Sequence, residues 1–276
     1  MQEKTSFDFS ALALVGGLGI ILWAFGAEGG DYGALNPIVH YTPYAIIIGG
    51  TFMATIASVR LATFMKFVPI IRVLIQEKHV GGAEVVELFD RLAQRARREG
   101  LLSLESEAET LEDPFLKKGI QLVVDGTEAD NIETVLRIDM DQRHARHKEG
   151  FEMFEKMGGY SPTMGIVGTV MGLIIVLAQL DTGGDLGGGI AVAFLATLIG
   201  VGIANLVWLP IQGKLEAKNE AEQEHLEMML QGVLAIQAGE NPRTVVGKLE
   251  GFLSPVERER RAGAEGAGES EPAAAG

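Results

Sequence analysis

Apolar residues in this chain gather in a few long runs without charged side chains, and two of the runs lie close together in the second half of the chain. These two runs are residues 160–180 and 186–213. Because a helix rises about 1.5 Å per residue, about 20 residues cross the roughly 30 Å hydrocarbon core of a bilayer. Each run therefore predicts a membrane-spanning helix.

Two further apolar runs lie near the N-terminus, so the pattern predicts an all-α integral membrane protein with four transmembrane helices. The predicted spans are 9–27, 38–59, 157–180 and 186–211. The first two spans lie within 1–64 and the last two within 157–213, with a helical cytoplasmic domain over 65–156 between the two pairs. Cytoplasmic C-terminal helices are predicted over 214–253 and a disordered tail over 254–276. The tail is rich in Glu, Arg, Ala and Gly and has no apolar cluster, which is typical of disorder.

Small residues recur every three or four positions along the two late spans. This spacing puts them on one face of each helix and lets the two helices approach closely. We interpret the pair as a hairpin that lines something. The residues of this small face that matter below are Gly165, Gly168, Thr169, Gly172, Ala193, Thr197 and Gly200.

Charge gives the orientation of the spans. None of the 23 lysines and arginines lies in the connectors 26–43 and 181–189, whereas the middle segment and the C-terminal part are rich in them. Cytoplasmic flanks hold Lys and Arg, so both termini and the middle segment are predicted to be cytoplasmic. The net charge of -14 argues against a nucleic-acid binder, and the absence of cysteine removes disulfides and thiol chemistry.

The charged middle segment has the period of amphipathic helices. Residues 82–99 form the first, with Gly100 as its stop, and further helices are predicted around 104–111 and 115–124. From Asn131 the pattern predicts one long helix that can run on into the third span. Such a helix could carry force, although a solvated helical bundle is the plainer alternative. After the fourth span a charged helix continues, and Asn241 with Pro242 starts a short one.

No constellation of catalytic residues is found, so we expect no enzyme and no cofactor. His144 and His147 have a spacing that could bind a metal on a helix, but a solvated helix face is favoured because no third ligand is in view. The glycine-rich segment 183–189 lacks the ending of a phosphate-binding loop and is interpreted as an exported turn.

The four spans contain no Asp, Glu, Lys or Arg. Machines driven by ions usually place an ionisable group in the membrane. The chain therefore either moves no ions or takes a carboxylate from a partner. Thr169 and Thr197 could line an ion path with their hydroxyl oxygens; the alternative is that each hydroxyl bonds back to the carbonyl four residues earlier.

Pro162 and Pro210 stand near the predicted cytoplasmic ends of the third and fourth helices. Each proline removes a backbone donor and can kink its helix, which would give a hinge. A simple helix boundary explains a proline at such a place equally well.

Four blocks, YSPTMGIVGTVMGLI, AVAFLATLIGVGIANLVWLPI, ARREGLLSLE and LQGVLAIQAGENPR, resemble the flagellar motor stator subunits of the MotA/PomA family, within the MotA/TolQ/ExbB proton-channel superfamily. The resemblance runs from the first span to about Leu253. It implies four helices in the bacterial inner membrane, among membrane lipids, and a ring of five subunits around a pair of MotB/PomB-type partners. Each partner would supply the ion-binding aspartate that this chain lacks.

Position by position, the resemblance also implies roles. Pro162 and Pro210 match the two prolines that couple ion passage to movement. Arg97 and Glu105 match the charged pair that engages the rotor protein FliG, and Arg98 matches a neighbouring basic position. Thr169 and Thr197 match threonines near the ion path of sodium-driven members, so the transported ion is expected to be Na⁺ rather than H⁺.

Two other functions stay open at the level of sequence. Proteins of the ExbB/TolQ type share a similar third-span motif and energise envelope transport, but they generally have three membrane helices and lack the ARREGLLSLE block. The second alternative is a membrane scaffold without energy coupling whose cytoplasmic bundle binds a protein.

Overall fold

The computed structural model describes residues 41–75, 81–180 and 186–268, and within the N-terminal segment Gly16, Gly17, Gly19, Ile20, Trp23, Ala24, Gly26 and Ala27. Most of the predicted span 9–27 and the first residues of the span 38–59 therefore lie outside the described residues. Every regular element in the described ranges is a helix, as the sequence predicts.

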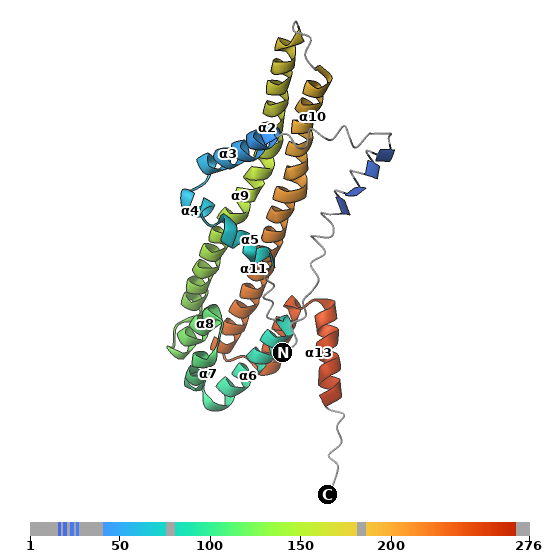
Figure 1. Ribbon diagram of the computed structural model, residues 1–276. Coiled ribbons are helices and arrows are strands. Elements are labelled where there is room, and N and C mark those ends of the chain that lie inside the picture. Colours follow the sequence, from blue (N-terminus) through green and yellow to red (C-terminus); the bar gives the residue numbers. More distant parts are fainter. Residues whose placement is uncertain are drawn as a thin grey trace. The chain divides into compact units, whose positions relative to one another are not determined.

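The helices pack as two units (Figure 1). Unit 1 takes in Met1–Gln76 and Lys148–Glu216, and unit 2 takes in Glu77–His147 and Ala217–Gly276. Unit 1 contains α2 (Tyr41–Tyr44), the π-helix η2 (Ala45–Gly49), α3 (Gly50–Ser58), α4 (Leu61–Phe64), α5 (Phe67–Ile75), α10 (Leu186–Ile203) and the π-helix η5 (Ala204–Trp208). Unit 2 contains α6 (Gly82–Glu99), the 3₁₀ helix η3 (Leu101–Leu104), α7 (Glu105–Thr110), α8 (Pro114–Val124), α12 (Pro242–Leu249), the 3₁₀ helix η6 (Glu250–Phe252) and α13 (Pro255–Gly268). Two long helices, α9 (Ala129–Ala178) and α11 (Leu209–Gln237), contribute to both units.

Two described helical stretches are long and apolar enough to cross a membrane. They are α9 over Ala129–Ala178 and the continuous stretch Leu186–Gln237, and they contain the third and fourth predicted spans. The second predicted span is helical from Tyr41 to Ser58 through α2, η2 and α3. The crossing of the membrane by that segment stays a prediction.

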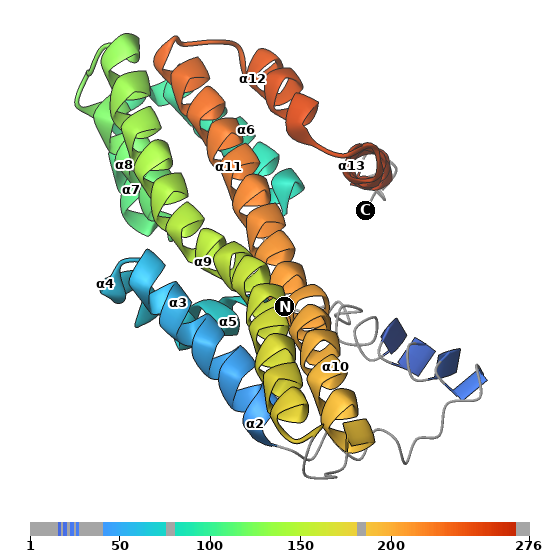
Figure 2. The same ribbon diagram turned by 90° about the horizontal axis from the view of Figure 1, so that it is seen from above.

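In unit 1, α3 runs antiparallel to α9 (Figure 2). Gly50, at the start of α3, leaves no room for a side chain against Met164, since a Cβ there would lie 2.7 Å from the Met164 sulfur. At the other end of α3, Lys156 of α9 donates to the Ser58 carbonyl at 3.0 Å. The two helices are therefore tied at both ends.

Aromatic side chains from four elements fill the space beside this helix pair. Phe67 of α5 stacks on Phe154 of α9 with ring centroids 5.3 Å apart, and Phe52 of α3 meets the Phe67 ring edge-on at 5.5 Å. Trp208, the last residue of η5, packs 6.1 Å from Phe52. Edge-to-face and offset pairs of this kind add about 0.5–1.5 kcal/mol each beyond the apolar area that they bury. This cluster holds α3, α5, α9 and η5 together.

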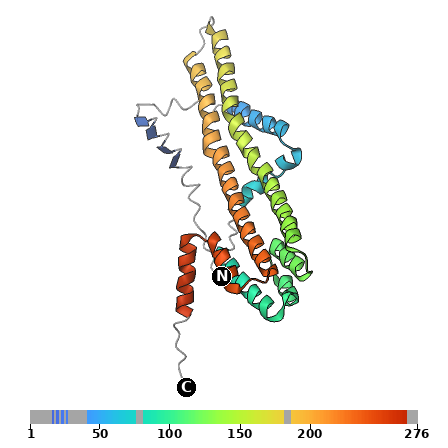
Figure 3. The same ribbon diagram turned by 180° about the vertical axis from the view of Figure 1, so that it is seen from behind.

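Unit 2 is built around a second apolar core, to which α6, α8, α9 and α11 all contribute. Figure 3 shows the teal and green helices α6 to α8 gathered beside the far end of α11. Phe89, Ile120, Leu136 and Val233 are fully buried there. Gly232 of α11 is required in this core, because a Cβ would lie 2.5 Å from the Phe89 ring.

Two predicted helix ends in unit 2, the stop at Gly100 and the start at Asn241, are confirmed. Gly100 terminates α6 with φ +85°, a conformation that side chains disfavour. Asp113 caps α8 by accepting hydrogen bonds from the N–H groups of Phe115 and Leu116 at 2.8 and 3.0 Å. Asn241 caps α12 in the same way, with Pro242 in the first turn.

The predicted disordered tail from 254 is corrected by the structure, which has helix α13 over Pro255–Gly268. A capping box starts this helix: Ser254 Oγ accepts from the Glu257 N–H at 3.3 Å, and Glu257 accepts from the Ser254 N–H at 3.0 Å. Arg261 is buried and pairs with Glu250 at 3.1 Å. The S-x-x-E pattern of residues 254–257 is a local helix-start signal that a prediction from apolar content alone does not take into account. Residues 269–276 lie outside the described residues.

Candidate functional site

The small residues of α9 and α10 bring these two helices into backbone contact, and the helices lie side by side in Figure 1. A Cβ at Gly200 would lie 2.7 Å from the Ser161 carbonyl oxygen and 3.0 Å from Gly165 Cα. A Cβ at Gly165 would lie 2.9 Å from the Ala196 carbonyl oxygen. Because each of these contacts is with backbone, a side chain at either glycine would push the helices apart.

The contact continues along the same face. A Cβ at Gly168 would lie 3.1 Å from Ala196 Cβ, and one at Gly172 would lie 2.9 Å from Ala193 Cβ. The structure therefore brings together all seven small residues that the sequence assigns to an ion path. Their part in ion passage stays a prediction.

Thr169 and Thr197 face each other across this contact. Their hydroxyl oxygens lie 2.5 Å apart, and Thr169 Oγ1 also lies 2.8 Å from the Ala193 carbonyl and 3.1 Å from the Gly165 carbonyl. A hydroxyl has one proton, so when Thr169 donates to a carbonyl, Thr197 is the donor in the hydroxyl pair. The back-bond to the residue four positions earlier is present at Thr169, but it competes with a bond to the other helix.

Ser161 is a further polar residue of this contact. It is fully buried and donates to the Gly200 carbonyl at 2.9 Å. This hydrogen bond joins α9 to α10 two helical turns from Thr169. No spacing rule separates a serine that bonds across helices from one that simply lets them approach.

The boundary interpretation is wrong for Pro162, whereas Pro210 stands at the junction between η5 and α11. Pro162 lies inside α9, which continues to Ala178. Pro210 follows the π-helix η5, in which the Leu209 N–H donates to the Ala204 carbonyl five residues earlier. A π-turn closes its hydrogen bond over five residues instead of four, so it holds one extra residue. Such turns are frequent at functional sites. The hinge role of the prolines stays a prediction.

The three predicted rotor-facing charges lie in unit 2. Arg97 and Arg98 are in the last turn of α6, and Glu105 is the first residue of α7. All three are exposed, and within the described part of the chain none makes an ion pair or a side-chain hydrogen bond. They are therefore available to a partner.

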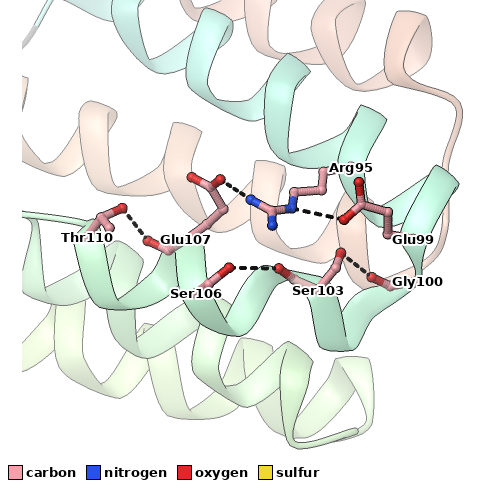
Figure 4. A network of polar contacts seen from close by, with 7 residues as sticks. All are labelled: Arg95, Glu99, Gly100, Ser103, Ser106, Glu107 and Thr110. Carbon is pink, nitrogen blue, oxygen red and sulfur yellow. Dashed lines mark hydrogen bonds and ion pairs between the residues drawn. The ribbon is translucent and has the colours of Figure 1, made fainter.

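Arg95, two residues earlier, behaves differently. Its guanidinium pairs with Glu99 of α6 at 3.3 Å and with Glu107 of α7 (Figure 4). Beside it, Ser106 of α7 donates to the Ser103 carbonyl of η3 at 3.3 Å. Arg95 thus links α6 to α7. A surface pocket of about 330 Å³ beside it is lined by Leu102 and Glu105.

The comparisons with known proteins agree with this geometry. Residues 107–228 match the MotA/TolQ/ExbB proton channel family. "Motility protein A" of Borreliella burgdorferi is 37% identical over 77% of this chain and 82% of its own length, and "Chemotaxis protein PomA" of Vibrio alginolyticus is 32% identical over 90% and 95%. The chain belongs to the MotA/PomA family.

Solved structures of this family have the same fold. The structure of C. jejuni MotAB has a TM-score of 0.83 at 29% identity and covers 90% of this chain and 97% of its own. The structure of the flagellar MotAB stator complex from Bacillus subtilis has a TM-score of 0.80 at 32% identity, over 91% and 97%. The resemblance stated from four sequence blocks is confirmed.

In this member of the MotA/PomA family, the two histidines bond from α9 to α11 within unit 2. His144 Nδ1 lies 2.8 Å from the Asn219 amide nitrogen, and His147 Nδ1 lies 3.0 Å from a Glu222 carboxylate oxygen. The hydrogen bond from His147, together with Arg143 at 3.1 Å, lowers the pKa of Glu222. The described residues contain no group of three metal-binding side chains, and these histidines join two helices rather than face solvent alone.

The glycines of the α9–α10 contact provide a direct stability test. Gly200→Ala is expected to destabilise the protein by about 1–3 kcal/mol, because the added Cβ overlaps backbone of α9. Thermal unfolding of the purified full chain in detergent measures this loss.

Gly202→Ala is the matched control on the same helix, because a Cβ at Gly202 would have no neighbouring atom within 4 Å. Equal unfolding temperatures for the two variants would show that α9 and α10 are not in backbone contact.

Proposed function

We propose that this chain is the ring subunit of an ion-driven flagellar stator. Membership of the MotA/PomA family over nearly the whole chain carries the proposal. In this proposal four helices span the bacterial inner membrane, both termini are cytoplasmic, and five copies surround a pair of MotB/PomB-type subunits. The named relatives are motility proteins, which favours a motor over an ExbB/TolQ-like energiser of transport.

The missing membrane carboxylate supports a partner of the MotB type. The described parts of the third and fourth spans contain no Asp, Glu, Lys, Arg or His, so we infer that the site that binds and releases the ion includes a carboxylate from another chain. The two solved structures most relevant here are of MotAB, a complex of two proteins. We expect an aspartate of the partner to face the α9–α10 contact.

Thr169 and Thr197 would then complete the ion site. The Thr169 hydroxyl stands within hydrogen-bonding distance of both the Thr197 hydroxyl and the Ala193 carbonyl, so these three groups offer oxygen ligands in place of water. Such ligands suit Na⁺, whereas a proton needs only the partner's carboxylate. Sodium is therefore the proposed ion, and the proton is the alternative.

Rotation of the ring would follow from repeated binding and release of ions. Each ion that binds or leaves the partner's aspartate changes which ring subunit the aspartate prefers, and the ring turns around its anchored partner. The unpaired charges of Arg97, Arg98 and Glu105 would pass this movement to FliG. Exposed pairs contribute about 1 kcal/mol or less each, which suits a contact that is gripped and released.

Deletion of the gene tests the proposal as a whole. Cells should keep flagellar filaments of normal number but lose swimming, because assembly does not require torque. Filament counts by electron microscopy and tracking of single cells measure the two properties. Swimming that persists in a strain with no other stator gene would refute the proposal.

The ion path is tested at Thr169. Thr169→Val keeps the shape but removes the hydroxyl, and is expected to lower ion flux and torque about two- to tenfold, the effect of one lost hydrogen bond or ligand. Thr169→Ser should keep both. Thr163→Val is the control, because the exposed Thr163 hydroxyl bonds only to the Tyr160 carbonyl of its own helix. Unchanged torque and unchanged sodium dependence in Thr169→Val would remove this residue from the mechanism.

The rotor contact is tested by charge reversal. Arg97→Glu is expected to weaken FliG binding about fivefold or more, because repulsion replaces an attraction of about 1 kcal/mol. Arg91→Glu makes the same change at an exposed position of α6 and should bind normally. A charge reversal in FliG should partly restore the torque of Arg97→Glu, and full independence of the two changes would exclude the contact.

A further inference from the structure

Helices α4 and α5 of unit 1 present two different faces. One face belongs to the aromatic cluster and its surroundings: Phe64, Phe67, Ile70, Ile71 and Leu74 pack against buried residues of α9 and η5. Ile70 comes so close to α9 that a Cβ at Gly150 would lie 3.2 Å from it. The inner face of this segment is therefore fully used.

The outer face is also apolar, yet it is open. Met65 is 74% exposed, Val68 57% and Val73 49%, and Pro69 between them is exposed as well. Residues 65, 69 and 73 are four apart, so they follow one line along the surface. A water-facing helix would carry polar side chains at such positions.

The charges on this outer face have one sign. Residues 60–75 contain Arg60, Lys66 and Arg72 and no Asp or Glu, in a chain whose net charge is -14. Arg60 is paired with Glu149 of α9 at 3.0 Å. Lys66 and Arg72 are exposed and, among the described residues, make no ion pair or side-chain hydrogen bond. Two unpaired cations thus flank an exposed apolar line.

We propose that the outer face of α4 and α5 binds anionic lipid headgroups at the cytoplasmic surface of the membrane. Lys66 and Arg72 hold the lipid phosphates, while Met65, Val68 and Val73 enter the boundary between headgroups and acyl chains. A helix that lies in this plane has basic side chains beside apolar ones. The absence of acidic side chains from residues 60–75 selects a negatively charged lipid over a zwitterionic one.

The position of the segment in the chain supports this occupant, and here the inference rests on the proposed topology. The backbone is extended at Val59 and Arg60, between α3 and α4. The predicted second span ends at residue 59, so α4 and α5 begin where that span leaves the membrane on the cytoplasmic side. A neighbouring copy of the chain is the competing occupant.

The test uses the full chain, purified in a non-ionic detergent, and follows its thermal unfolding as lipid is added. Phosphatidylglycerol should raise the unfolding temperature at lower concentration than phosphatidylcholine with the same acyl chains. The double variant K66Q/R72Q should need about 25-fold more phosphatidylglycerol, since each of the two basic side chains near an anionic surface contributes about a factor of five. Its response to phosphatidylcholine should not change, which shows that it is folded.

The control R91Q/R243Q removes two exposed positive charges from unit 2 and should respond like the unaltered chain. If this control loses as much affinity, the effect is one of net charge and the proposal fails. Soluble glycerol 3-phosphate should give no shift; an equal shift would indicate an anion site rather than a lipid surface. Equal responses to the two lipids would overturn the proposal in favour of a neighbouring copy. None of these outcomes depends on torque, so failure of the stator function is read separately, from swimming.

Discussion

The backbone contact between α9 and α10 is the constraint on which the rest of unit 1 depends. With Gly165 and Gly200 facing each other, two apolar helices meet without intervening side chains, and polar groups on both helices come within bonding distance. In a bilayer, where lipid is as apolar as leucine, such contacts associate helices through packing and hydrogen bonds. The hydroxyls of Ser161 and Thr169 therefore both join the helices and depend on their closeness.

The arginines of α6 in unit 2 have two kinds of role: one forms ion pairs within the fold, and two are exposed without a partner in the described part of the chain. Arg95 is used within the fold, because it pairs with Glu99 of α6 and Glu107 of α7, whereas Arg97 and Arg98 on the same helix bind nothing in the described part of the chain. A surface arginine without a partner keeps its full donor capacity for another molecule. Arg95 and Arg97 therefore have different roles although they are only two positions apart, because the helical period points them to different sides of α6.

The hydrophobic periodicity and the glycine, asparagine and proline residues at helix ends predicted most of the helices. Gly100 and the Asn241–Pro242 pair marked helix ends correctly because their preferences are local and strong. The cross-helix bonds of Ser161 and His147 were not predictable, because a partner distant in sequence is not encoded in spacing. Helix α13 was missed because the prediction rested on low apolar content, whereas the structure shows a capping box at its start and a buried Arg261 within it. For the site, the sequence named the residues that meet at the α9–α10 contact, but only the structure shows which hydroxyls bond across it.

The π-helix η5 has a geometric consequence for unit 1. One residue more than an α-helical turn is accommodated between Ala204 and Leu209, so the side chains before and after it are out of phase by about 100° relative to an unbroken α-helix. This phase lets α10 present Thr197 and Gly200 to α9 while Trp208 still reaches the aromatic cluster. The π-turn acts as an angular spacer: it sets the rotation between the hydroxyl pair and the aromatic cluster independently of the distance along the helix.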